Sequence, residues 1–504
     1  MSQPMQVEGD MGGSDTTKEK QRGVWYLAKN VGLLTASNFA SKILVFFLVP
    51  LYTSVLSTGE YGTYDLYNTT VSLLIPIMTA NIADAVLRFS LDDNAEHPAV
   101  LHVGLHYALL GAAGVCIGTV SLLILGLGKT LAQWWLMFLL MYFIHSVLSV
   151  ISNFARGIDC VREVAIGGVI SSVTLVGLNI LFLLPLHMGL AGYFLATISS
   201  MTVHLVYLCV ALRLWRYLRF ERMDANLAAS MRAYGIPLTA NSVAWWVNSA
   251  SDRYIVTAFC GVAQNGIYAV AGKIPQILNV MQTIFTQAWV LSAVRDVDSQ
   301  DKGGFFRKTY NAYGCFMVLL CSMLIAFDKI IARLLYANDF YEAWRYAPPL
   351  LVAIMFGALS GHLGGAFAAA KDSQAYAQTT VVGAVANVIV NFALVPVLGA
   401  MGAAISTCLS YWIVWFMRRR LVVKYVNVSF NLSRDYISYL VLIIQCSILI
   451  LLESPPIFIN ALELCAFLVQ LVLYREELGM WRGLVIGAFS AVRKKSALKK
   501  GSGD

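Results

Sequence analysis

Charge is scarce in this 504-residue sequence. Asp, Glu, Lys and Arg together make up 13% of the residues, against roughly 25% in an average soluble protein. The sequence also contains no HExxH, GxSxG or P-loop motif, and no pair of acids spaced for catalysis. We therefore expect neither catalytic residues nor transport driven by an ATPase segment of this chain.

Cysteine motifs are missing as well. The nine cysteines form no CxxC motif and no Cys/His cluster, and most of them lie inside apolar runs. We therefore expect free thiols, with no disulfide framework, metal site or cofactor. The start of the chain is polar and lacks the apolar core of a cleavable signal peptide. Residues 1–24 are predicted to form a disordered cytoplasmic tail.

Apolar residues are abundant instead, at 58% of the chain. A helix that spans a membrane needs about 20 apolar residues. Fourteen runs of suitable length occur, at residues 30–54, 65–90, 99–125, 131–154, 163–185, 189–212, 231–259, 265–292, 305–327, 346–369, 375–398, 400–421, 435–453 and 456–474. The sequence therefore predicts an all-α, polytopic membrane protein with about 14 transmembrane helices.

The Lys and Arg residues are distributed unevenly between the two sides of the membrane. With the N-terminus placed in the cytoplasm, 27 of the 36 fall in inside segments, and only Lys129, Lys329, Arg333 and Arg345 fall in outside segments. Such a bias sets membrane orientation, so we expect both termini in the cytoplasm. It also accounts for the net charge of +8 without a nucleic-acid partner.

Two segments of the first half recur in the second half in the same order. A shift of 204 residues places Gly62–Tyr64 on Gly266–Tyr268, and a shift of 210 places Gly192 on Gly402. Similar halves of about 200 residues are typical of transporters built from parallel repeats. A single duplication with small insertions accounts for both shifts.

The repeat and the apolar runs together predict the domain organisation. We expect two parallel six-helix bundles at residues 25–212 and 233–424. The basic segment 213–232 joins them, and it either lies on anionic lipid headgroups or is a solvated linker. Two additional helices at 425–475 and a basic cytoplasmic tail at 476–504 follow.

Polar residues inside the predicted spans are the candidate functional residues, because a charge at mid-bilayer costs roughly 2.5–3.5 kcal/mol. Seven residues are candidates: the cations Lys42, Arg88, Arg253 and Lys273, and Asn241, Asn248 and Asp252 on one face of the span 231–259. They either face a substrate or hold helices together, for example through an Asp252–Arg253 contact. Asp84 lies four residues before Arg88, so these two either pair or leave Arg88 free for a ligand.

A cavity with up to four cations, many amides and few acids suits one type of ligand. That ligand is anionic at one point, rich in hydroxyl groups at another and lipidic elsewhere. The guanidinium group of Arg donates paired hydrogen bonds to phosphate, and amide side chains suit sugar hydroxyls. Pro50 and Pro237 lie in helices that carry these charges, as is typical of transporter helices that bend.

Three stretches carry a family resemblance: PLYTSVLSTGEYGTYDL (50–66), YGIPLTANSVAWWVNSASDRYIV (234–256) and GIYAVAGKIPQIL (266–278). They are similar to the lipid-linked oligosaccharide flippases, the Wzx-type polysaccharide biosynthesis branch of the multidrug/oligosaccharidyl-lipid/polysaccharide exporter superfamily. The resemblance implies two six-helix bundles arranged in a V, a cationic central cavity and alternating access.

The resemblance also implies a cargo. An undecaprenyl-diphosphate-linked oligosaccharide would move from the cytoplasmic to the outer leaflet of a bacterial inner membrane, for surface polysaccharides such as O-antigen or exopolysaccharide. Arg253 and Lys273, with Lys42 and Arg88, would face its diphosphate or sugars. Membrane lipids and other polysaccharide-assembly membrane proteins would be its partners.

Alternative functions remain open. A lipid II flippase and a multidrug or cation antiporter would share the fold. The buried acids Asp84 and Asp252 each lie near an arginine, which disfavours the antiporter. A membrane glycosyl polymerase, an enzyme of a different class, is disfavoured by the short outer loops.

Overall fold

The computed structural model describes residues 44, 46–92, 94–126, 129–218, 223–296, 301, 304–370, 372–428, 430–452 and 455–479. Within these residues all regular secondary structure is helical, as predicted. The N-lobe consists of α2 (Val49–Val55), α3 (Thr58–Met78), α4 (Ile82–Ser90), α5 (His97–Ile124), α6 (Lys129–Gly157), α7 (Val161–Leu183) and α8 (Gly189–Ala211).

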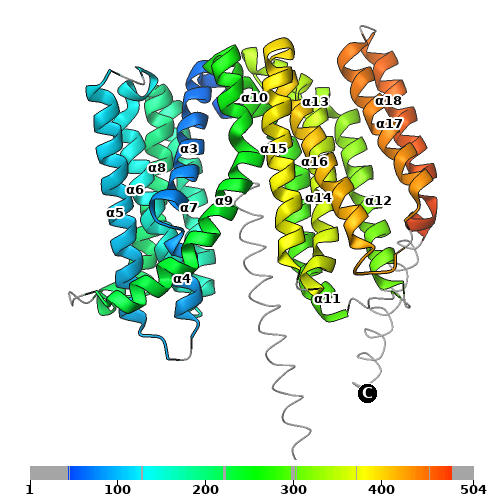
Figure 1. Cartoon of the computed structure of the whole chain (residues 1–504). Helices are drawn as coiled ribbons and strands as arrows, with labels where there is room; N and C mark the ends of the chain where they lie inside the picture. The colour runs from blue at the N-terminus through cyan, green and yellow to red at the C-terminus, as the bar shows by residue number, and fades with distance from the viewer. Residues whose placement is uncertain are drawn as a thin grey trace, which may run out of the picture.

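A short 3-10 turn, η1 (Leu214–Arg216), leads toward the C-lobe. The C-lobe consists of α9 (Ala225–Cys260), α10 (Val262–Ala271), α11 (Pro275–Asp296), α12 (Phe305–Ala326), α13 (Asp328–Leu335), η2 (Asn338–Arg345), α14 (Ala347–Ala369), α15 (Ser373–Leu398) and α16 (Ala400–Val422). The last two helices, α17 (Leu432–Leu451) and α18 (Pro456–Leu473), pack against α12 on the side away from the N-lobe (Figure 1).

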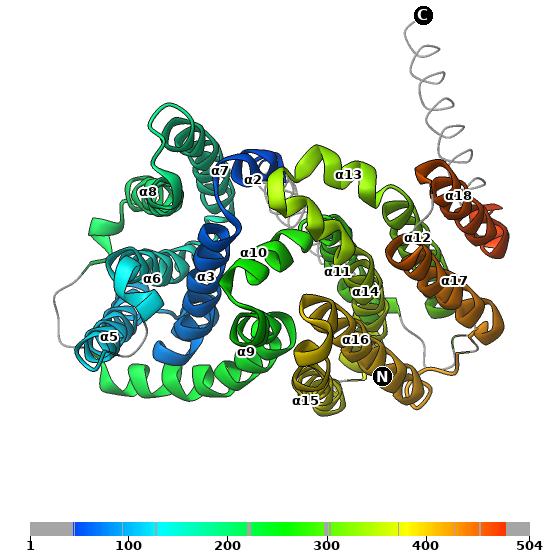
Figure 2. The same ribbon diagram turned by 90° about the horizontal axis from the view of Figure 1, so that it is seen from above.

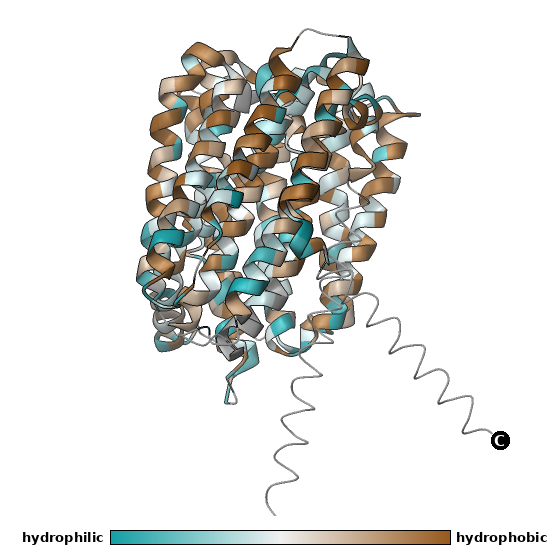
Figure 3. Ribbon diagram, turned by 90° about the vertical axis from the view of Figure 1, so that its right-hand side faces the viewer, coloured by the Kyte–Doolittle hydropathy of each residue, from teal (hydrophilic) through white to brown (hydrophobic). Residues whose placement is uncertain are grey.

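The helices have the length and composition of membrane spans. Nine described helices are long and apolar enough to cross a membrane, and α3 with α4, joined by a 58° bend, would be a tenth. The predicted span 30–54 lies largely outside the described residues, and the predicted span 265–292 is the broken pair α10 and α11. Figure 3 shows apolar residues over much of the helix surface, with polar residues gathered toward the lower end of that view.

The two lobes meet where α3 crosses α10 (Figure 2). A Cβ atom on Gly62 would lie 2.1 Å from the carbonyl oxygen of Val262, and one on Gly266 would lie 1.9 Å from that of Thr58. Both helix backbones therefore touch at positions where only glycine fits. Gly62 and Gly266 are the residues that the internal repeat superimposes, so the contact is reciprocal.

The start of α3 is fixed by its own sequence. Ser57 and Glu60 form a capping box, in which the Ser57 hydroxyl accepts from the Glu60 amide at 3.2 Å and the Glu60 carboxylate accepts from the Ser57 amide at 2.9 Å. Two residues later, Gly62 contacts α10. The Glu-Tyr-Gly portion of the family-like stretch 50–66 thus has a structural role.

Helix α9 packs on both lobes, one with each half of its length. Asp224 caps its first turn by accepting from the amides of Asn226 and Leu227. Its first half packs on the N-lobe, where the Thr239 hydroxyl donates to the Pro76 carbonyl at 3.2 Å. Its second half packs on α15 and α16. Because the helix begins at Ala225, it includes the end of the segment 213–232 that was predicted as a linker.

Candidate functional site

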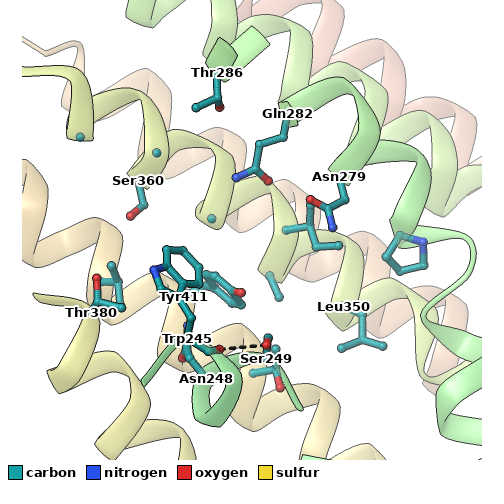
Figure 4. Close-up of a pocket in the computed structure, with 18 of the residues that line it drawn as sticks. Trp245, Asn248, Ser249, Asn279, Gln282, Thr286, Leu350, Ser360, Thr380 and Tyr411 are labelled. Carbon is teal, nitrogen blue, oxygen red and sulfur yellow. Dashed lines mark hydrogen bonds between the residues drawn. The ribbon is translucent and has the colours of Figure 1, made fainter. Parts of the chain in front are cut away.

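A cavity of about 810 Å³ lies in the C-lobe, between the second half of α9 and helices α11, α14, α15 and α16. Its volume is within the usual range of ligand-binding pockets. The wall is rich in neutral polar groups, which include Asn248, Ser249, Asn279, Gln282, Thr286, Ser360, Thr380 and Tyr411 (Figure 4). Trp245 and Phe367 add aromatic surface.

Three glycines of α14 provide the space on one side. Gly357, Gly361 and Gly364 share a helix face because they are four and three residues apart, and all three line the cavity. A Cβ atom would lie 3.1 Å from the Tyr411 ring at Gly357 and 2.7 Å from the Tyr376 ring at Gly364. Larger residues there would displace these two rings, which also line the cavity.

Asp252 lies in the wall and is held by its own lobe. Its side chain is 6% exposed, and it accepts hydrogen bonds from the Tyr268 hydroxyl at 2.5 Å and the Thr407 hydroxyl at 3.4 Å. These partners belong to α10 and α16. The carboxylate thus ties three helices together.

Arg253 reaches the other lobe. Its Nε lies 3.3 Å from Asp65 Oδ2 on α3, and its Nη1 donates to the Thr69 hydroxyl at 3.2 Å. The expected Asp252–Arg253 contact is limited to the Arg253 backbone amide, which donates to Asp252 at 3.0 Å. We call the Asp65–Arg253 contact the interlobe ion pair. In this ion pair the Arg253 Nε makes no hydrogen bond to Asp65. The Arg253 guanidinium therefore has N–H groups available for a ligand.

Arg418, near the end of α16, is a second cation in the cavity wall and is 3% exposed. It donates to the hydroxyls of Thr379 at 3.0 Å, Ser360 at 3.0 Å and Thr380 at 2.8 Å, and it lies 3.8 Å from the centre of the Tyr376 ring. Among the described residues no carboxylate forms an ion pair with it. It is a permanent positive charge surrounded by neutral groups.

A second carboxylate, Asp372, lines the cavity beside the start of α15. It accepts from the Ala375 amide at 2.9 Å and from the Tyr425 hydroxyl at 2.5 Å. The Ala375 amide and the Tyr425 hydroxyl hold the pKa of Asp372 below its usual value. The described wall thus contains two arginines and two carboxylates, whereas the sequence predicted up to four cations with few acids.

The seven candidate residues are distributed as follows. Asn248, Asp252 and Arg253 line the cavity together. Lys273 is half-buried in the turn between α10 and α11, and Asn241 is exposed on α9; neither is part of the described lining. Lys42 lies outside the described residues.

Arg88 is exposed on α4 and forms an ion pair with Asp92, away from the cavity. Asp84 instead accepts from the Asn81 amide group at 2.7 Å. Of the two alternatives, the Asp84–Arg88 pair does not form, and Arg88 pairs with Asp92 instead. Both residues lie within α4, so their spacing is as expected; each has a different partner, Asp92 for Arg88 and, for Asp84, Asn81, which precedes the helix in a left-handed conformation.

Two charged residues of this region were not among the candidates. Asp65 is the first residue of the predicted span 65–90, a position at the membrane edge. Arg418 belongs to an Arg-Arg-Arg run that was counted as an inside, orienting segment. The hydroxyl groups of Thr379 and Thr380, which accept hydrogen bonds from Arg418, distinguish Arg418 from its arginine neighbours. These threonines lie on α15, and only the fold brings them next to Arg418.

Comparison with known proteins places the chain in a family. The polysaccharide biosynthesis protein family matches residues 27–290, more than half of the chain. A search of curated proteins finds no match. Among solved structures, the chain is similar to one described as the lipid II flippase MurJ in an inward closed conformation, with 13% identity and a TM-score of 0.67 over 90% of this chain and 99% of that one.

It is also similar to an inward-facing multidrug resistance MATE family transporter of the MOP superfamily, with 13% identity and a TM-score of 0.61 over 79% of this chain and 96% of that one. A MOP superfamily transporter from Pyrococcus furiosus gives 13% identity and a TM-score of 0.54 over the same shares of the two chains. At sequence identities this low, the structural similarity shows that the fold is shared and nothing finer. The chain is therefore a multi-pass membrane protein with the MOP superfamily fold, and it belongs to the polysaccharide biosynthesis protein family.

Proposed function

We propose that the protein moves an undecaprenyl-diphosphate-linked oligosaccharide from the cytoplasmic to the outer leaflet of a bacterial inner membrane by alternating access. The observation that carries this proposal is the pairing of Arg418 with a neutral, hydroxyl- and amide-rich wall. Such a wall suits sugar hydroxyls, and aromatic rings such as Trp245 suit the apolar faces of sugars. Family membership supports the same class of cargo.

The two arginines would act on the diphosphate in different ways. The N–H groups of Arg418 already donate to Thr379, Ser360 and Thr380. Arg418 would therefore attract the anion through its charge. Arg253 uses one hydrogen bond, to Thr69, and has donors left for a phosphate oxygen. The carboxylates of the wall oppose an anion less strongly because tyrosine hydroxyls already donate to both of them.

Binding of the diphosphate would also affect the contact between the lobes. A phosphate group near Arg253 would compete with Asp65 for the same guanidinium. Loss of the interlobe ion pair would then weaken the attachment of α9 to α3. In this way the cargo would favour the separation of the lobes that alternating access requires.

The membrane potential favours the proposed direction. Outward movement of negative charge from a cell interior at negative potential gains about 2.3 kcal/mol per charge for every 100 mV. A diphosphate is therefore driven outward by the potential.

The experiment is a flipping assay in proteoliposomes with labelled undecaprenyl-diphosphate oligosaccharide. We expect Arg253→Ala and Arg418→Gln to reduce flipping at least tenfold, and Arg418→Lys, which keeps the charge, to reduce it less. Arg88→Gln is the matched control, because Arg88 is exposed and paired outside the cavity. Thermal unfolding of each variant verifies that it is folded.

The outcomes separate the alternatives. Full flipping by folded Arg253→Ala would remove Arg253 from the site. Equal loss in Arg88→Gln would show that the effect is not specific to the cavity. Movement of lipid II in preference to the oligosaccharide lipid would identify a lipid II flippase. Movement of a cationic dye alone would identify an antiporter.

A further inference from the structure

Three of the four cations predicted on the outside gather at one place. Lys329 and Arg333 lie four residues apart on α13, and Arg345 ends η2. The Lys329 ammonium lies 4.3 Å from the centre of the Trp344 ring, and the Arg345 guanidinium lies 5.7 Å from it. Positive residues are depleted on the outer side of membrane proteins. A group of three cations around Trp344 is therefore unusual on this side, and a bound anion would explain it.

A small pocket lies beside this cluster. It has a volume of about 220 Å³ and is lined by Lys329, Ile330, Arg333, Tyr341, Trp344, Ile459 and Asn460, from α13, η2 and the start of α18. Two of these residues are cations, and no carboxylate belongs to the described lining. Arg345 lies outside the pocket, 4.0 Å from Glu342. Lys329 and Arg333 are thus the two cations of the cluster that line the pocket.

The surroundings of the pocket are apolar. Ile330 is 47% exposed and Leu334, one turn further along α13, is 74% exposed. On α18, Ile457 and Phe458 precede the pocket residue Ile459 and are 83% and 52% exposed. Exposed side chains of this kind on a membrane protein lie against hydrocarbon chains. The pocket is therefore a polar site at the edge of an exposed apolar surface.

Two buried carboxyls, Asp328 and Glu463, lie close enough to interact with the charge of Lys329. Asp328 is fully buried, and neither of its oxygens has a hydrogen-bond partner among the described residues. Burial raises the pKa of Asp328 well above its usual value. Glu463 accepts from the Gln445 amide at 3.1 Å. Lys329 therefore shares its charge with these carboxyls, whereas the hydrogen bond of Arg333 among the described residues is to the Tyr341 hydroxyl, at 3.4 Å.

We propose that Lys329 and Arg333 bind the phosphate of an anionic phospholipid of the outer leaflet, with its acyl chains against α13 and α18. The size of the pocket suits a headgroup, and Arg333 supplies donors for phosphate oxygens. The site is separate from the C-lobe cavity and does not depend on the proposed cargo. A lipid bound there would bridge α18 to η2, which packs on α10 next to the crossing of the lobes.

The test is native mass spectrometry of the full-length protein in mild detergent with equal amounts of phosphatidylglycerol and phosphatidylcholine. We expect one phosphatidylglycerol molecule more on the wild type than on the double variant Lys329→Gln/Arg333→Gln. Arg333→Gln alone should weaken its binding about fivefold, as expected for one cation near a lipid surface. Because Arg333 is exposed, this single variant should fold normally.

Arg88→Gln is again the control, since it removes an exposed cation on α4, which lies toward the opposite end of the molecule from α13 (Figure 1). Equal phosphatidylglycerol binding by wild type and double variant would overturn the proposal. So would equal retention of phosphatidylcholine, or an identical decrease in the control. Displacement of the lipid by millimolar inorganic phosphate would show a site for free phosphate in place of a lipid. A wild-type protein that retains the lipid in phosphate supports the proposal.

Discussion

Replacement of Gly266 by alanine tests the crossing of α3 and α10. The added methyl group would lie 1.9 Å from the Thr58 carbonyl oxygen, about 1.5 Å closer than an ordinary contact of 3.4 Å. The obstacle is backbone, so no side chain can rotate away. Either the two helices separate by more than an ångström or the lobes lose this contact. Overpacking in well-packed sites typically costs about 1–3 kcal/mol, and we expect at least the upper end here.

The assay is thermal or chemical unfolding of purified Gly266→Ala, Gly62→Ala and the double variant. Because both substitutions separate the same helices, the double variant should cost less than the sum of the two. Gly59→Ala is the matched control, since Gly59 lies on α3 with nothing within 4 Å of its added Cβ. There, alanine should be neutral or stabilising by about 0.5–1 kcal/mol through helix propensity. Wild-type stability of Gly266→Ala would refute the close contact.

Three further predictions concern the site. Asp65→Asn, Arg253→Gln and their double variant should give a coupling energy of about 1 kcal/mol in a double-mutant cycle of unfolding, because the pair is partly exposed; zero coupling would mean that the ion pair does not join the lobes. Gly364→Ala should lower the flipping rate several-fold with a smaller effect on unfolding, because its methyl group would lie 2.7 Å from a tyrosine ring of the cavity. Tyr425→Phe should destabilise the protein at neutral pH, where Asp372 is ionised. A lowered carboxyl pKa contributes stability above the unfolded pKa, near 3.8, and the contribution disappears as pH falls through the folded pKa. The two proteins should therefore converge in acid, and a constant difference at every pH would contradict the assigned role.

Sequence reasoning was most successful where the signal is local or repeated. Apolar runs predicted the helices, and the match of Gly62 to Gly266 marked the residues that meet between the lobes. Sequence reasoning could not place the break of the α3–α4 segment at Ala80, where the left-handed backbone packs against α9 and Gly235 lies against the Ala80 carbonyl.

The sequence also could not predict which acid pairs with Arg253, for a different reason. Arg253 has acid neighbours at Asp252 and, across the fold, at Asp65, and only tertiary structure decides between them. Asn241 and Asn248 share a face of an ideal helix, yet α9 leans from one lobe to the other. As a result Asn248 faces the cavity and Asn241 does not. The position of each residue relative to the two lobes thus determines whether its side chain reaches the cavity.

The glycine crossing has a consequence for the origin of the chain. Gly62 contacts Val262 while Gly266 contacts Thr58, and the same 204-residue shift relates both pairs. Contacts exchanged in this way are the mark of an isologous interface, as in a two-fold symmetric homodimer. An ancestral half-length protein could have dimerised through this one surface before its gene was duplicated and fused. Once fused, the copies were free to differ, as they do at Asp65, whose counterpart in the second half is Ala269.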